Sequence, residues 1–379
     1  MITPLTALDP RTPRTVRNIR LAQDCGLPQY RVASICFLGL FMDLMADIKE
    51  AYELPPASIA SLLVSNDFDR LRQKLDQVLD LLLSLSSIEL NWSNLDKMYP
   101  SVSDLICVNL YHHASICTLH RPHLWLTGYC PLDSPHLRDN SAGITTILTA
   151  LVQSLSSARS ILEINSWIYH HQAYPLVFLP KLWKDYCSMV FALFEGCVVT
   201  WFCLTKTRSY WYTDDHTAAT AATAATVAAE NTSVLNLTLA HRRAFRVGLV
   251  DAVRTLRDLD YTSTRRDGIP NMVTPLYTYA NAMLEEVQRV EEVLSSSGRG
   301  PVQDRGPIVR RRGREDSDVA GLVAGMDGLC LYDGQDGDTE REAWVFLSLL
   351  GCPVGVGAEE MYWRSANTHL WREFWNTMK

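Results

Sequence analysis

Residues 144–162, ITTILTALVQSLSSARSIL, decide the fold class, because their apolar side chains recur with the period of an α-helix. Apolar residues follow one another at intervals of four, three, four, three and four residues, which places them on one helical face. They are Ile144, Leu148, Leu151, Leu155, Ala158 and Leu162. The same intervals recur over 276–294, and no segment alternates convincingly with a period of two. The sequence therefore predicts an all-α fold.

Further helices are expected on both sides of this stretch. They span 32–52, 67–85, 101–120, 175–206 and 235–259. Pro122 is expected to end the helix over 101–120, because proline lacks a backbone N–H. Only seven of the nineteen glycines precede residue 298, and glycine weakens a helix interior by about 1 kcal/mol relative to alanine. Residues 15–297 are thus predicted to form a single multi-helix domain.

Four segments differ from this domain in composition. Residues 1–14 are predicted to be a flexible, proline-containing lead-in, and residues 207–233, with their alanine–threonine tract, a mobile insertion. Residues 298–343 are rich first in arginine and then in acids, a glycine-rich and charge-segregated pattern that predicts a disordered linker. Residues 344–379 are aromatic again and are predicted to end in a short helix.

The overall composition excludes several classes of protein. Apolar residues make up 47% of the chain, which is enough for a sizeable core. A net charge of −7 argues against a nucleic-acid binder with a basic face running through its fold. The ten cysteines include no CxxC pair, so we expect neither a disulfide scaffold nor a cysteine zinc cluster. The apolar run 187–204 contains Glu195, and a charge near the middle of a membrane span is costly. The run is therefore interpreted as a buried helix, and no membrane association is expected. No cofactor is expected either.

Histidines gather between residues 112 and 136. They are His112, His113, His120, His123 and His136. With Cys117 they could supply zinc ligands, but a zinc site wants four converging ligands, and no paired spacing repeats elsewhere. Histidines that pack in the core or cap a helix are the favoured interpretation.

Two DxxxD pairs suggest an alternative, enzymatic function. Asp43 with Asp47 and Asp76 with Asp80 each lie one helical turn apart. Helical isoprenoid synthases hold magnesium and diphosphate between such carboxylates, which are oxygen ligands that suit Mg²⁺. In that fold the second aspartate motif lies far later in the chain, whereas these two are close together. An isoprenoid-synthase-like enzyme therefore stays as the alternative to a non-enzymatic protein.

Residues 105–124, LICVNLYHHASICTLHRPHL, carry a resemblance to a known family. The pair Tyr111-His112 and the ending Leu119-His120-Arg121-Pro122 are similar to a helix in the middle homology region of fungal zinc-cluster transcription factors. The resemblance covers roughly residues 15–295. It implies a helical regulatory domain in a nuclear, non-enzymatic transcription regulator, with a cytoplasmic location as the alternative. It also implies a metabolic or secondary-metabolite gene set and protein partners from the transcription machinery or the family, including a dimer.

The chain departs from that family in one respect that bears on DNA binding. The family reads DNA through six cysteines that hold two zinc ions beside a basic helix, and this sequence has no such cluster. The chain resembles the later part of the regulatory domain, and we expect no specific DNA binding by this chain alone. A small-molecule-sensing helical module is a further alternative, which overlaps the first because such helical cores are able to take a metabolite effector.

The residues of the family motif have a structural interpretation. With Pro122 as a helix end, Arg121 would cap the last carbonyl groups or pair with a carboxylate of a neighbouring helix. His120 would pack beside it. A structural role is favoured over any ligand role.

Two features of the C-terminal region suggest regulation. Arg310, Arg311, Arg312 and Arg314 form the best candidate for a nuclear import signal, with a solvated linker as the alternative. Acidic residues and then Trp371, Phe374 and Trp375 resemble an activation segment, in which acids keep aromatic side chains available to a coactivator. The alternative, slightly favoured, is that this terminal helix docks on the core.

Overall fold

The computed structural model describes residues 29–85, 102–138, 140–170, 189–212, 239–264, 273–297, 349–356, 359–363 and 367–377. Within these ranges the chain is mostly helical, and the extended backbone is limited to a single bridge between Val354 and Met361. The predicted all-α fold is confirmed.

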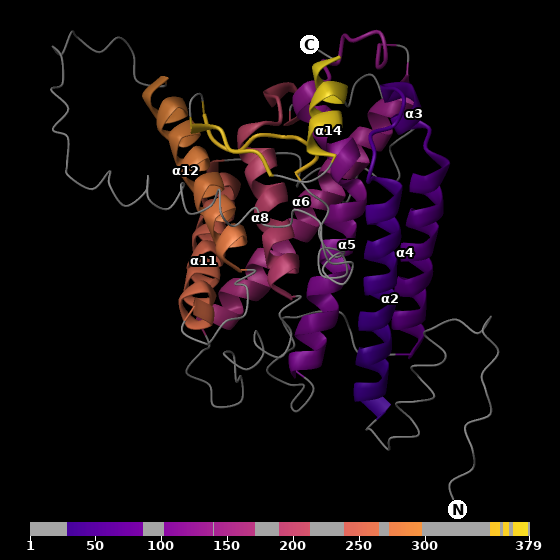
Figure 1. Ribbon diagram of the computed structural model, residues 1–379, viewed down its shortest axis with the longest axis vertical. Coiled ribbons are helices and arrows are strands. Elements are labelled where there is room, and N and C mark those ends of the chain that lie inside the picture. Colours follow the sequence, from indigo (N-terminus) through magenta and orange to yellow (C-terminus); the bar gives the residue numbers. More distant parts are fainter. Residues whose placement is uncertain are drawn as a thin grey trace, which may run out of the picture.

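A set of long helices forms the body of the molecule (Figure 1). They are α2 (Gln29–Ala51), α4 (Asn66–Leu85), α5 (Val102–Tyr129), α6 (Ser141–His170) and α8 (Met189–Thr205). Helix α5 is central, because it packs against α2, α6 and α8, and α4 lies on the outer side against α2. The short α3 (Ile59–Leu63) joins α2 to α4.

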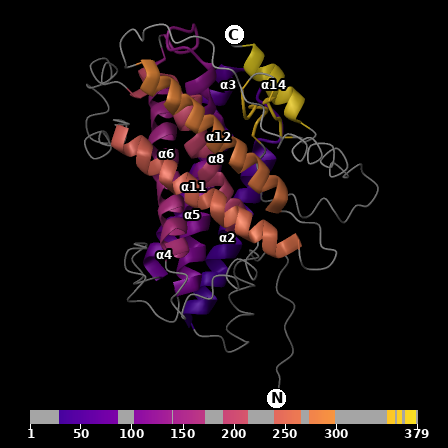
Figure 2. The same ribbon diagram turned by 90° about the vertical axis from the view of Figure 1, so that its left-hand side faces the viewer.

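A second layer covers one side of these helices. Helices α11 (Leu239–Thr264) and α12 (Val273–Ser297) pack against each other, with α11 on α6 and α12 on α8. Figure 2 shows the two lying side by side and inclined to the helices behind them. The apolar stripe predicted over 276–294 faces inward here: Leu276, Ala280, Met283 and Val287 are buried.

Polar side chains begin several helices at the points where backbone N–H groups lack partners. The Ser58 and Ser61 side chains form a reciprocal capping box at α3. The backbone N–H of Phe68 donates to Ser65 Oγ at 3.3 Å near the start of α4. The backbone N–H of Gly143 donates to Asn140 Oδ1 at 2.8 Å at the start of α6.

Helix α8 is buried all round: every residue from Val198 to Leu204 is inaccessible or nearly so. It begins at Met189, and the earlier part of the predicted helix, 175–188, lies outside the described residues. No helix in the described ranges combines the length and apolar character that a membrane crossing needs.

The predicted helix end at Pro122 is wrong. Helix α5 continues through Pro122 to Tyr129. An interior proline costs about 3 kcal/mol, but the turns after it bury Leu124, Trp125 and Leu126 completely. Each such side chain stabilises the fold by about 1.5–3 kcal/mol, so tertiary packing outweighs the local preference.

The segments of distinct composition are described only in part. Residues 1–14 and 298–343 lie outside the described residues. Of the insertion predicted over 207–233, residues 207–212 are described, and they include a 3₁₀ turn (Ser209–Tyr212) that buries Trp211. Of residues 344–379, those from Leu349 to Thr377 are described with two short gaps, and they include α14 (Thr368–Asn376).

Candidate functional site

The residues of the family motif all lie on the central helix α5, and all are buried. Tyr111 is 2% exposed, His120 is 1% exposed, and Arg121 is fully buried. The remaining members, His112, Leu119 and Pro122, are buried as well. The motif therefore faces neighbouring helices and not solvent.

Arg121 pairs with Glu195 of α8 in the interior of the bundle. Both side chains are completely inaccessible. The Arg121 guanidinium carbon also lies 5.8 Å from the centre of the Trp125 ring. Burial lowers the pKa of Arg121, to about 9, which leaves the group charged at neutral pH. Of the two roles expected for Arg121, pairing with a carboxylate is the one in the structure; helix-end capping is wrong because the helix continues.

Histidines on α5 are held neutral by burial. Burial lowers the pKa of His112 and of His123 to about 4, and that of His113 and of His120 to about 3. The ring of Phe68 packs against His120 and His123, with ring centres 5.3 and 4.3 Å apart. His123 Nε2 lies 3.0 Å from the carbonyl oxygen of Leu62. His136 is exposed.

The candidate metal ligands do not converge in the structure. Across the described ranges, no three side chains of histidine, cysteine, aspartate or glutamate are grouped so that they could hold a metal ion. Cys117 Sγ instead lies 3.7 Å from the carbonyl oxygen of Ser154 on α6, and burial raises the pKa of its thiol. His112, His120 and His123 thus occupy packing positions in the core.

The four aspartates of the DxxxD pairs are not brought to one site. Asp47 pairs with Lys74 of α4 at 2.5 Å, while Asp76 and Asp80 are exposed. A groove of about 500 Å³ lies beside Asp47. Its lining is Asp47, Glu50, Ala51, Glu53, Leu54, Asp67 and Arg70. Neither Asp43 nor the α4 pair contributes to this groove.

Of the two C-terminal candidate sites, only the aromatic residues of the terminal helix lie within the described residues. The run Arg310, Arg311, Arg312 and Arg314 lies outside the described residues. Trp371 and Trp375 are each 1% exposed and Phe374 is 8% exposed. All three face the core, an arrangement that corresponds to the docking alternative.

We call the described residues between Leu349 and Thr377 the C-terminal strap. Three indole N–H groups form hydrogen bonds at this strap. Two of these bonds connect it to the helical bundle and one lies within the strap. Trp125 Nε1 of α5 donates to the carbonyl oxygen of Leu349 at 3.1 Å, and Trp375 Nε1 donates to that of Leu350 at 2.7 Å. Trp371 Nε1 donates to the carbonyl oxygen of Tyr52, just after α2, at 3.3 Å. The strap therefore spans from the end of α2 across α5.

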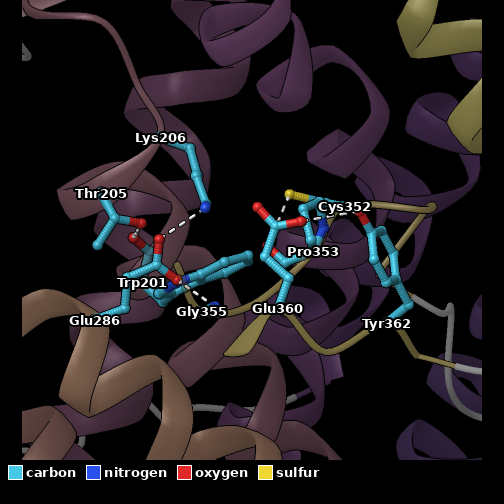
Figure 3. Close-up of polar contacts among 9 residues, drawn as sticks. All are labelled: Trp201, Thr205, Lys206, Glu286, Cys352, Pro353, Gly355, Glu360 and Tyr362. Atoms are coloured by element: carbon cyan, nitrogen blue, oxygen red, sulfur yellow. Dashed lines mark hydrogen bonds and ion pairs between the residues drawn. The ribbon is translucent and has the colours of Figure 1, made fainter. Parts of the chain in front are cut away.

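A second anchor of the strap is the buried carboxylate of Glu286 on α12 (Figure 3). Its Oε2 accepts hydrogen bonds from Trp201 Nε1 and from the backbone N–H of Gly355, both at 2.8 Å. Its Oε1 lies 2.7 Å from Lys206 Nζ. The Glu286 side chain is 4% exposed and that of Lys206 is 24% exposed. Donors from α8, from the residue after α8 and from the strap thus meet on one carboxylate.

The strap residues near Glu286 are polar but hold no activated nucleophile. Tyr362 donates to Glu360 Oε2 at 3.1 Å. Burial raises the pKa of the Cys352 thiol to about 12, so it stays protonated at neutral pH.

Sequence reasoning missed the Glu286 site, although a signal was present. Glu286 lies between Met283 and Val287 on the apolar stripe of α12. A charged residue on such a stripe must be paired when it is buried. The partners Lys206 and Gly355 follow from tertiary structure and not from spacing.

The chain matches no protein-family model, no curated protein and no solved structure. The function is therefore argued from the residues and their geometry.

The indole hydrogen bond of Trp375 is a first testable feature. Trp375→Phe keeps an aromatic ring against Tyr129, whose ring centre lies 5.1 Å away, but leaves the Leu350 carbonyl oxygen without this donor. We expect the free energy of unfolding to fall by about 1–3 kcal/mol, measured by urea denaturation. Glu373→Ala, on the exposed face of the same helix, is the control and should change it by less than about 0.5 kcal/mol. Equal effects of the two variants would contradict the docked arrangement.

Proposed function

We propose that this chain is a transcription regulator. It resembles the regulatory domain of fungal zinc-cluster transcription factors but lacks their DNA-binding zinc cluster. It acts in the nucleus on a metabolic or secondary-metabolite gene set, and it is not an enzyme. The observation that supports this proposal is the burial of the whole motif, Tyr111-His112 and Leu119-His120-Arg121-Pro122, on the central helix.

The burial of these residues helps to distinguish a structural motif from a sequence match that arose by chance. A chance occurrence of histidine and arginine on a helix is usually solvent-exposed. Here Arg121 is completely buried and forms an ion pair with Glu195 of another helix. A motif that organises a domain in this way is the kind of feature that a family shares, which favours the resemblance.

The charge of the chain fits a regulator that reaches DNA through a partner. A net charge of −7 disfavours direct phosphate binding by the fold. Protein partners from the transcription machinery or the same family would then supply the DNA contact. The run Arg310–Arg314 would serve nuclear import, because a basic run fits an acidic receptor groove.

The test is to tether the full chain to an unrelated DNA-binding domain in a fungal host. We expect reporter output to change several-fold, up or down, relative to the DNA-binding domain alone. In a parallel binding assay, the untethered chain should give no sequence-dependent shift of duplex DNA at physiological salt.

The matched control is the same fusion carrying Asp43→Ala and Asp47→Ala. These substitutions would abolish an isoprenoid-type activity but should leave the reporter unchanged. An unchanged reporter with the unmodified fusion, together with magnesium-dependent turnover of prenyl diphosphates that the double variant loses, would replace the proposal with the enzyme.

A further inference from the structure

We propose that the acidic groove at the end of α2 binds the basic run Arg310–Arg314 of the same molecule. This groove has a volume of about 500 Å³, and its lining includes Asp47, Glu50, Glu53 and Asp67. The inference goes beyond the proposed function, because it concerns a contact within the chain.

The groove carries more negative charge than the described residues neutralise. Its lining has four carboxylates and one guanidinium, that of Arg70. Asp47 and Asp67 each pair with a basic residue of α4. Glu50 and Glu53 are exposed and form no ion pair among the described residues. A concave surface lined mainly by one sign of charge concentrates its electric field, so this groove favours a cationic occupant.

The arrangement of the carboxylates favours an extended cation over a metal ion. Within the described part of the chain, no three acidic, histidine or cysteine side chains are grouped so that they could hold a metal ion. The lining also includes Ala51 and Leu54, and Leu54 is 57% exposed. Arginine suits such a mixed surface, because its guanidinium pairs with carboxylates while its aliphatic stem packs on apolar groups.

A buried hydroxyl group beside the groove also lacks a partner. Tyr52 is 4% exposed, and its hydroxyl has no hydrogen-bond partner among the described residues. Burial raises the pKa of this hydroxyl, and the carboxylate of Asp67 raises it further. The hydroxyl therefore stays neutral close to a carboxylate of the groove. A buried polar group without a partner is costly, and a guanidinium N–H that enters beside Asp67 would supply the missing donor.

The basic run has the charge and the position along the chain to occupy this groove. Residues 305–314, RGPIVRRRGR, contain five arginines and no acid. They follow the end of α12, and the strap comes after them. Trp371 of the strap donates to the carbonyl oxygen of Tyr52 at 3.3 Å, and the residues on either side of Tyr52 line the groove. The chain therefore returns to the margin of the groove after the run.

Attachment to the same chain makes a weak contact sufficient. Exposed ion pairs are each worth at most about 1 kcal/mol, so a free peptide of this composition should bind weakly. Residues 298–309 separate α12 from Arg310 and span at most about 40 Å, similar to the roughly 45 Å length of helix α6 (Ser141–His170). A connection of this length gives an effective concentration in the millimolar range, which favours occupancy of the groove.

Docking would withhold the arginines from other acidic surfaces. If the run serves nuclear import, the groove and the import receptor compete for it. This consequence rests on the proposed function, whereas the contact itself does not, and its tests use no transcriptional output.

Trypsin cleavage of the full chain tests the contact, because trypsin cuts after arginine. Glu50→Gln combined with Glu53→Gln removes the two unpaired charges of the groove at exposed positions. We expect cleavage after residues 310–312 to become about fivefold faster or more, relative to cleavage after Arg299 in the same sample. This change corresponds to about 1 kcal/mol of lost docking, the scale of one or two exposed ion pairs.

The control is Asp76→Asn combined with Asp80→Asn, which removes two exposed charges of α4 outside the groove. It should leave the cleavage ratio unchanged. A ratio that rises equally in both variants, or in neither, would overturn the groove as the site. Protection that disappears when the chain is diluted would place the run of a second copy in the groove, and would overturn the contact within one molecule.

A labelled peptide of residues 305–314 gives a reciprocal measurement. The unmodified chain should bind this peptide weakly, because its own run competes. A chain in which the arginines at 310, 311, 312 and 314 are replaced by glutamine should bind it about tenfold more tightly or more. Adding Glu50→Gln and Glu53→Gln should abolish that gain. Equal binding by the unmodified chain and the arginine variant would overturn the proposal.

Discussion

Lowering the pH is expected to unfold this protein well above pH 4, because four histidines of α5 must take up protons when the helices separate. In the folded chain His112 and His123 have a pKa of about 4, and His113 and His120 have a pKa of about 3. In the unfolded chain each returns to about 6.5. Burial is the main cause of all four shifts; the bond to Leu62 opposes it at His123, His112 adds to it at His113, and His123 adds to it at His120.

The sign of the effect follows from proton uptake. The folded pKa is lowered, so below pH 6.5 the unfolded state binds more protons than the folded state, and stability falls as the pH falls. Each histidine contributes a loss of about 1.4 kcal/mol per pH unit, and the four together lose about 5.5 kcal/mol per pH unit. A stability of about 8 kcal/mol at neutral pH, within the usual range, would then be exhausted near pH 5.

The measurement is helical circular dichroism against pH. His112→Leu removes one titrating group whose ring nitrogens have no hydrogen-bond partner among the described residues, so the unfolding midpoint should move down by about half a pH unit or more. His136→Gln, at an exposed position, should leave the midpoint unchanged. A midpoint below pH 3 that is the same in all three chains would contradict the argument.

The helices could be predicted where one face carries the apolar residues. The apolar stripes over 144–162 and 276–294 both lie within observed helices. An apolar face opposite a polar face predicts a helix that packs one side against a core. The end of α5 could not be predicted. Its stop signal, Pro122, is local, whereas the burial of Trp125 against Phe202 that carries the helix onward is tertiary.

Part of the buried polar network could be predicted from the sequence. Glu195 stands out as the one charged residue of an apolar run, and a carboxylate partner for Arg121 was expected on a neighbouring helix. The identity of that carboxylate depends on how α5 packs across α8. The spacing of residues along the sequence does not predict this packing. Glu286 gave a weaker signal, because Glu285, Glu291 and Glu292 surround it in the sequence and hide its inward position.

Arg121→Met is expected to lower the free energy of unfolding by about 3–5 kcal/mol. The methionine fills much of the space but leaves the Glu195 carboxylate fully buried without its counter-charge. Water cannot replace the guanidinium at an inaccessible site, so the cost is the desolvation of an unpaired charge. Chemical denaturation with the helical signal as readout measures the loss.

A second substitution separates this charge effect from loss of packing. Arg121→Met combined with Glu195→Met removes both charges, and replacing a buried ion pair by apolar side chains is often neutral or stabilising. We expect the double variant to recover most of the lost stability. Arg159→Met, which breaks the exposed pair with Glu163, should cost less than about 1 kcal/mol. A double variant no more stable than Arg121→Met would mean that Arg121 acts by shape and by its contact with Trp125.

A recovered double variant also separates the two roles of the motif. If the family motif serves only to hold α5 against α8, the folded double variant should keep the reporter effect of the unmodified chain. If it folds and the reporter effect is lost, Arg121 takes part in regulation beyond its structural pairing. The stability of the double variant has to be measured first, because only a folded chain distinguishes these outcomes.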